Sequence, residues 1–158
     1  MLFRSIALLI LSVVAVIARL ATPIFMFMMA ANGNPADMEE ISVGMGLGSI
    51  GTLLAWIANL IVSIGLLVVA IIAAIQFSGR GRTGAIIVGA TVIVSVILYW
   101  IVSVISALIG GAIAGNPYDV GTIYTVEGIA ELLRVIVVAA ALLVGSYMVL
   151  AWGRKNDA

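Results

Sequence analysis

The sequence predicts an all-α integral membrane protein in which four apolar helices, arranged as two hairpins, form a helical bundle and a single membrane domain over residues 1–158. Composition is the first reason: 65% of the 158 residues are hydrophobic and 9% are charged, whereas soluble domains carry about 25% charged residues. The mean hydropathy of +1.35 is the second. The third is a series of long uncharged runs, since about 20 apolar residues in a helix cross the roughly 30 Å of bilayer hydrocarbon.

Each run predicts one helix. The first is apolar except for Arg19, the second and third contain no charge, and the fourth ends at Trp152. Gly, Asn and Pro between the runs stop helices, because proline biases the preceding residue away from the α region. A tight basic turn over residues 78–84 joins the second and third helices. We expect the helices at about 5–31, 50–77, 84–114 and 130–152.

The first segment has an alternative interpretation. Met1–Arg4 followed by Ser5–Ala18 also resembles the basic and apolar regions of a signal peptide. No convincing cleavage site of small residues follows Arg19, and the apolar run resumes as far as Ala31. We therefore expect this helix to be retained, with cleavage as the alternative.

Charged residues separate into two groups when four spans are drawn. Because positively charged loops stay in the cytoplasm, both termini and the basic turn are predicted to face the cytoplasm. Arg134 and Asp157 break the pattern, and Arg19 lies inside a span. The basic group is Arg4, Arg80, Arg82, Arg154 and Lys155, and the acidic group is Asp37, Glu39, Glu40, Asp119, Glu127 and Glu131.

A short motif occurs twice. Gly-Asn-Pro-Ala-Asp at Gly33–Asp37 recurs as Gly-Asn-Pro-Tyr-Asp at Gly115–Asp119, each time after an odd-numbered helix. The even-numbered helices end in the similar segments Phe77–Arg80 and Ala151–Arg154. Duplication of a helical hairpin explains the pattern, and so do generic turn and stop signals. Both explanations stand at this point.

Two glycine-rich stretches match a nucleotide-binding motif by spacing alone. Gly46–Gly51 and Gly79–Gly84 both match G-x-G-x-x-G, but a dinucleotide site needs a preceding strand and an acidic residue about 20 positions later. Neither is predicted here. We interpret the first stretch as a site of close helix packing, since small residues let helix backbones approach in membranes. The predicted packing residues are Gly44, Gly48, Gly51, Gly111 and Gly115.

Several kinds of chemistry are excluded by composition. The chain has no His and no Cys, which removes the commonest general base, the commonest metal ligand and all thiol chemistry. No carboxylate is expected inside the helices apart from Glu131 at an outer edge, which argues against proton-driven pumps. We therefore predict that the protein is not an enzyme, with no catalytic residue, metal or cofactor other than structural membrane lipid.

Two polar features needed an interpretation. A cation at the centre of a span costs about 2.5–3.5 kcal/mol on insertion scales, so Arg19 is expected to reach outward to water, with a carboxylate from a neighbouring subunit as the alternative. Tyr124, Glu127, Glu131 and Arg134 recur at helical spacing. We expect the segment that holds them, Gly121–Arg134, to extend the fourth helix at the outer surface.

The middle of the chain carries the most specific pattern. Gly48–Phe77, the turn Ser78–Arg82 and the run Thr83–Ile105 form a glycine-rich helix start, a long apolar helix, a very short basic turn and a second apolar helix. This arrangement resembles the major pilins of type IV secretion and conjugation systems, including archaeal DNA-import pilins. The chain differs from them in two further apolar segments and in the lack of a clear cleavable signal.

The resemblance implies a multi-pass subunit stored in the cell membrane that polymerises with its own copies into an extracellular helical filament. It implies bound lipid, a secretion or import machinery as partner, and DNA as transported cargo only. The resemblance also implies that Arg80 and Arg82 contact lipid head groups, and guanidinium groups do bind phosphate bidentately. The alternatives are that both arginines only mark the cytoplasmic side, and that the chain is a small accessory or pore-forming subunit of a larger membrane complex.

Overall fold

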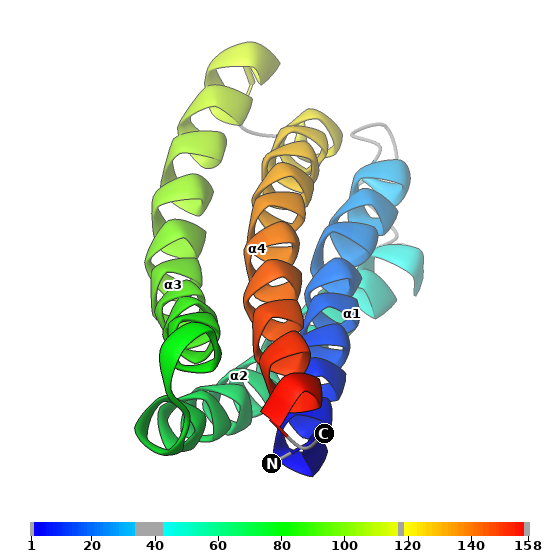
Figure 1. Ribbon diagram of the computed structural model, residues 1–158. Helices are drawn as coiled ribbons and strands as arrows, with labels where there is room; N and C mark the ends of the chain where they lie inside the picture. The colour runs from blue at the N-terminus through cyan, green and yellow to red at the C-terminus, as the bar shows by residue number, and fades with distance from the viewer. Residues whose placement is uncertain (1, 34–42, 117–118, 157–158) are drawn as a thin grey trace. The chain divides into compact units, whose positions relative to one another are not determined.

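The computed structural model describes residues 2–33, 43–116 and 119–156, and the regular structure within these ranges is entirely helical. This confirms the all-α fold with four long apolar helices, each long and apolar enough to cross a membrane. The chain is a multi-pass membrane protein. The helices are α1 (Leu2–Asn32), α2 (Val43–Gln76), α3 (Gly79–Ala114) and α4 (Val120–Asn156) (Figure 1).

Helix α4 begins at Val120, well before the predicted start near residue 130. Asp119 caps it: the carboxylate accepts a hydrogen bond from the backbone N–H of Thr122 at 3.1 Å and another from the Thr122 hydroxyl at 2.7 Å. Such a cap satisfies a backbone donor that the first turn leaves unpaired. The side-chain hydrogen bond from Thr122, together with the backbone one, holds the pKa of Asp119 below its ordinary value.

The connection between α2 and α3 consists of Phe77 and Ser78 alone, which is shorter than the predicted turn. The Ser78 carbonyl accepts hydrogen bonds from the backbone N–H groups of Gly81 at 3.2 Å and Arg82 at 3.3 Å. Gly79 begins α3 with a φ of +51°, which glycine adopts without steric cost. The basic residues of the predicted turn therefore stand in the first turn of α3. Helix α2 also begins earlier than predicted, at Val43.

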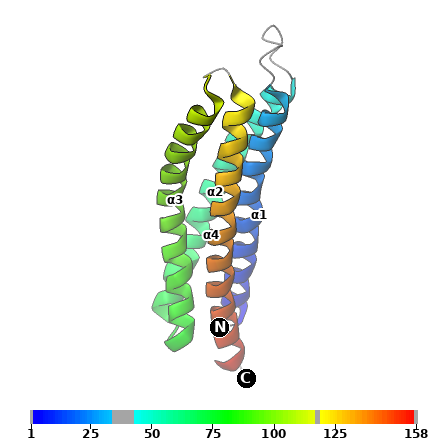
Figure 2. The same cartoon turned by 90° about the horizontal axis from the view of Figure 1, so that it is seen from above.

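The chain divides into two compact units. Every helix contributes to both units, and the prediction of a single membrane domain stays a prediction. Within each unit α1 lies beside α4 (Figure 2): the Ser12 and Ser146 hydroxyls are 2.6 Å apart in unit 1, and Gly128 packs against the Phe27 ring in unit 2. Unit 1 comprises Met1–Ile17, Asn59–Ile97 and Ile136–Ala158, and unit 2 comprises Ala18–Ala58 and Leu98–Val135.

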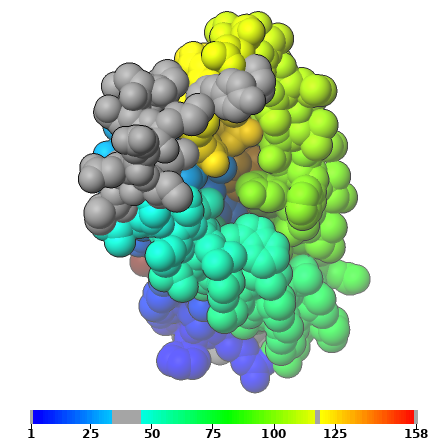
Figure 3. All heavy atoms as spheres, turned by 180° about the vertical axis from the view of Figure 1, so that it is seen from behind, coloured from blue at the N-terminus to red at the C-terminus, as the bar shows by residue number. Residues whose placement is uncertain are grey.

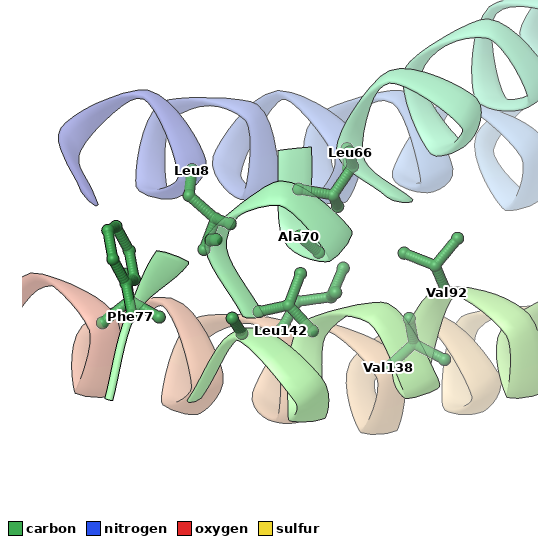
Figure 4. Packing of buried hydrophobic residues seen from close by; sticks show 12 residues of the cluster. Leu8, Leu66, Ala70, Phe77, Val92, Val138 and Leu142 are labelled. Atoms are coloured by element: carbon green, nitrogen blue, oxygen red, sulfur yellow. The ribbon is translucent and has the colours of Figure 1, made fainter. Parts of the chain in front are cut away.

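Unit 1 has an apolar core supplied by all four helices. Leu8, Leu66, Val88 and Leu142 are fully buried there, and Figure 4 shows side chains of this cluster pointing toward one another. The rings of Phe77 and Trp152 pack against each other with centroids 4.7 Å apart. Helix packing and the apolar core therefore explain the cohesion of this unit.

The outer surface is strongly apolar. Helices α2 and α3 form much of the face seen in Figure 3, and both carry large exposed apolar side chains, such as Ile75 at 78% and Leu108 at 70%. Contiguous apolar surface of this kind is rare on soluble monomers. Facing lipid or another protein, it needs no polar cover.

Two predictions concern residues outside the described ranges. The first Gly-Asn-Pro copy falls largely on residues 34–37, and the second includes Pro117 and Tyr118. Asp37, Glu39, Glu40 and Asp157 also lie outside the described residues. Duplication, the grouping into two hairpins and the membrane orientation therefore stay predictions.

Candidate functional site

A cluster of charged side chains lies buried in unit 2. Arg19 of α1 and Glu131 of α4 are each 4% exposed, and Arg134 of α4 is 9% exposed. The expectation that Arg19 reaches outward to water is therefore wrong. The charges of Glu131 and Arg134, which belong to the same chain, both act on Arg19.

Glu131 and Arg134 form an ion pair within the cluster. The Arg134 Nε donates to Glu131 Oε2 at 2.7 Å, and Nη2 donates to Oε1 at 2.5 Å. Paired donation of this kind is the strongest geometry available to a guanidinium and a carboxylate. The segment Gly121–Arg134 thus extends the fourth helix as predicted, but its charged face does not lie at the surface. It belongs to α4, and the face that carries the ion pair packs inside unit 2.

Helix α3 supplies aromatic contacts to the same cluster. The guanidinium carbon of Arg134 lies 5.3 Å from the centroid of the Tyr99 ring, within the range of a cation–π interaction. The Tyr99 ring in turn meets Trp100 edge to face, with centroids 5.7 Å apart and planes at 76°. Three helices, α1, α3 and α4, therefore contribute to one arrangement of charge and aromatic rings.

Beside the ion pair lies a small cavity, which two carboxylate side chains help to line. Its volume is about 10 Å³, close to the space that one water molecule needs. The expectation of an interior without carboxylates other than Glu131 at an edge is therefore wrong, because Glu127 also lines this cavity from within α4. The complete lining is Met26, Tyr99, Val102, Ser103, Ser106, Glu127 and Glu131.

This arrangement has limited chemical capacity. Two carboxylates and three hydroxyl side chains, those of Tyr99, Ser103 and Ser106, can hold a water molecule or exchange a proton. Among the described residues, no group of three His, Cys, Asp or Glu side chains is placed to hold a metal ion. The spacing of Glu127, Glu131 and Arg134 was the signal in the sequence, but it did not indicate that this face of α4 turns inward.

The two arginines predicted to bind lipid lie in unit 1. Arg80 and Arg82 are both exposed in the first turn of α3, and that turn contains no acidic residue. The amino terminus of a helix carries a partial positive charge, which adds to the attraction for anions. This end of α3 therefore suits a phosphate group.

The predicted packing glycines have different surroundings. A Cβ atom at Gly48 would lie 2.5 Å from Met29 Cγ, and one at Gly51 would lie 2.4 Å from the Phe25 ring. These close contacts lie within one chain, in unit 2. Gly111 and Gly115 face open space, and Gly115 has a φ of +62°. Gly44 belongs to α2, but its surroundings lie outside what the structure describes.

Sequence reasoning missed a close contact between α3 and α4 in unit 1. A Cβ atom at Gly84 of α3 would lie 2.6 Å from the carbonyl oxygen of Gly145 in α4. Gly81 packs in the same way on the ring of Trp152. The small residues Ala141 and Gly145, spaced by four, were a usable signal for such a contact.

Comparison with protein-family models, with curated proteins and with solved structures found no match to the chain. Function is therefore inferred from contacts, burial and charge. Three features carry the inference: the buried cluster of unit 2, the basic first turn of α3, and the extent of uncharged helix surface.

Proposed function

We propose that the protein is a non-enzymatic structural subunit, stored in the cell membrane, that polymerises into a conjugative-type pilus with bound lipid and serves DNA transfer. The supporting observation is the uncharged length of α3. From Thr83 to Ala114 the helix has no charged residue. At 1.5 Å per residue this stretch is about 48 Å long.

At an ordinary tilt, the hydrocarbon of a bilayer is too thin to surround the whole of this stretch. Fitting about 48 Å of helix into about 30 Å of hydrocarbon needs a tilt of about 50°, beyond the usual range of 0–40°. In the most apolar 18-residue stretch of each helix, α3 has the smallest share of buried residues. That share is 17% in α3, compared with 39% in α4. Part of its apolar surface therefore needs cover other than lipid, and further copies of the chain provide it.

The basic turn supports the lipid part of the proposal. One copy brings Arg80 and Arg82 to the exposed first turn of α3. In a polymer these cations would recur in every subunit and repel one another. Anionic head groups relieve that repulsion, and they also keep the filament from holding passing DNA phosphates tightly.

Cross-linking tests self-assembly directly, because the natural chain has no cysteine. Single Cys substitutions at Ile86, Ile93 and Ile97, all exposed on α3, should yield disulfide-linked dimers in membranes. The matched control Val88→Cys, fully buried on the same helix, should yield none. Absence of dimer from every exposed position, together with monomeric sedimentation, would contradict the proposal.

A second function has one observation in its favour. The cavity of unit 2, lined in part by Ser103, Ser106, Glu127 and Glu131, suits an accessory or pore-forming subunit of a larger membrane complex. In that case proteoliposomes should show an ion flux that Glu127→Gln reduces. A structural subunit shows no such flux.

A further inference from the structure

The cavity of unit 2 places a second carboxyl group beside one that is already neutralised. Glu127 and Glu131 both line it and stand one helical turn apart on α4. Glu131 accepts two hydrogen bonds from Arg134, whereas Glu127 has no hydrogen bond and no ion pair within the described part of the chain. We propose that Glu127 is a proton-binding residue, which holds a proton in this cavity near neutral pH while Glu131 stays ionised. This site does not depend on self-assembly.

Unit 2 has few cations that could offset a second negative charge. Arg19 and Arg134 are the only basic side chains in the sequence of residues 18–58 and 98–135. Neither of them lines the cavity, and Arg134 is committed to Glu131. Two carboxyl groups that share one site do not both ionise unless a cation compensates each of them. Glu127, which lacks such a partner, is therefore the one that keeps the proton.

The hydrogen-bonding groups of the cavity wall suit a neutral carboxyl group. Ser106 is 3% exposed and donates its hydroxyl hydrogen to the Ser103 carbonyl at 3.2 Å, so its oxygen is left as an acceptor. The ionised Glu131 is an acceptor as well, which leaves the Tyr99 and Ser103 hydroxyls as donors. A protonated Glu127 supplies a further donor, whereas an ionised Glu127 adds one more acceptor to a wall that already has an excess.

Water in the cavity does not supply the missing compensation. The volume of about 10 Å³ holds roughly one water molecule, which replaces little of the hydration that an anion loses on burial. Nor do the surrounding helices supply it. Arg19 of α1 and Tyr99 of α3 belong to the same cluster, Tyr124 precedes Glu127 by one turn of α4, and residues 43–58 of α2 contain no titratable side chain.

Dicyclohexylcarbodiimide tests this proposal, because the lipid-soluble reagent takes the proton of a neutral carboxyl group and then bonds to its oxygen, which leaves a stable acylurea. The full chain is treated in lipid vesicles, and mass spectrometry locates the product. We expect modification of Glu127 near neutral pH, a loss of modification as the pH is raised, and none in Glu127→Gln. Asp119, the hydrogen-bonded cap of the same helix, is the matched control and should stay unmodified, as should Glu131.

Infrared spectroscopy gives a measurement that does not depend on access of a reagent. In a detergent without carbonyl groups, the carbonyl stretch of a neutral carboxyl group should be present in the wild-type chain and lost in Glu127→Gln, with circular dichroism to verify that both are folded. Identical spectra in this region would overturn the proposal, whatever the carbodiimide does. Equal modification of Asp119 and Glu127 would overturn it too, since Glu127 would then be an ordinary surface carboxylate. Protection of Glu127 by sodium ions but not by choline would identify a metal cation as the occupant and would likewise overturn it.

Discussion

A guanidinium group is stable in the interior of a membrane protein only where a carboxylate offsets its charge. Glu131 does this for Arg134 through two hydrogen bonds, and its charge also acts on Arg19. One carboxylate therefore faces two cations in unit 2. Glu127, which lines the adjacent cavity, brings a second carboxylate into the neighbourhood.

This arrangement predicts unequal effects of removing its members. Glu131→Gln leaves Arg19 and Arg134 without their nearest carboxylate and should lower the free energy of unfolding by about 3–5 kcal/mol. Arg134→Leu should cost less, because Arg19 still faces Glu131. Lys155→Gln, at an exposed position, should change it by less than about 0.5 kcal/mol. Denaturant titration in detergent micelles measures all three, and equal losses for the first two variants would contradict the arrangement.

The burial of Arg19 was not predictable from local sequence. Glu131, whose charge acts on Arg19, lies on α4, far along the chain. Helical spacing within Gly121–Arg134 indicates only that Glu131 and Arg134 share a face. Which face turns inward depends on how helices pack in unit 2. The same limit applies to the cavity, whose lining comes from α1, α3 and α4.

At the scale of elements, the closest approach is that of α3 and α4 in unit 1. Gly84 and Gly145 bring the two backbones together, so a side chain at either position meets main-chain atoms that cannot simply rotate away. Near this crossing, Arg80 and Arg82 occupy the exposed first turn of α3. The close packing and the two arginines that we propose to bind anions therefore lie at the same end of the helix.

Gly84→Ala should therefore destabilise the fold by about 1–3 kcal/mol, the range for overpacked sites. Gly65→Ala is the matched control in the same unit, because a Cβ atom there meets nothing within 4 Å. It should be neutral or stabilising by up to about 1 kcal/mol, since alanine favours helix over glycine. Thermal unfolding in detergent distinguishes the two, and identical behaviour would contradict the described packing.

Lipid retention tests the basic turn. Native mass spectrometry of purified wild-type assemblies should show a stoichiometric anionic lipid, and Arg80→Ala/Arg82→Ala should lose it or assemble weakly. Arg154→Ala/Lys155→Ala removes an equal charge from other exposed positions and should retain the lipid. Delipidated wild-type filaments of unchanged structure, together with a normal Arg80/Arg82 variant, would reduce these arginines to markers of membrane orientation.

Helix number and type were predictable because uncharged runs of about 20 residues have no other stable form in a bilayer. The helix starts were less so. Helix α4 gains its first turns from the Asp119 cap, and α3 gains its first turn through Gly79 and the carbonyl of Ser78. Both starts depend on local hydrogen bonds within polar segments, where hydropathy gives no signal.

For the whole molecule, the distribution of charge and of apolar surface matters most. The basic residues other than Arg19 and Arg134 belong to unit 1, and the acidic residues other than Asp157 belong to unit 2. The positive-inside rule explains such a division. The uncharged length of α3 is the observation on which the proposed self-assembly rests.

Membrane orientation follows from this charge division. Ser78→Cys, beside the basic turn, should react with an impermeant maleimide only after the cytoplasmic side is opened. Asn116→Cys, after α3, should react in intact cells. Both positions are exposed. Reaction of the two cysteines from the same side would refute the four-span orientation.

The central claim is that membrane-stored copies polymerise into a filament. Electron microscopy of filaments sheared from producing cells tests it most directly, with mass spectrometry to identify the subunit. We expect helical filaments composed of this chain and lipid. Cells that hold abundant folded chain in their membranes, yet shed no filament containing it, would contradict the claim.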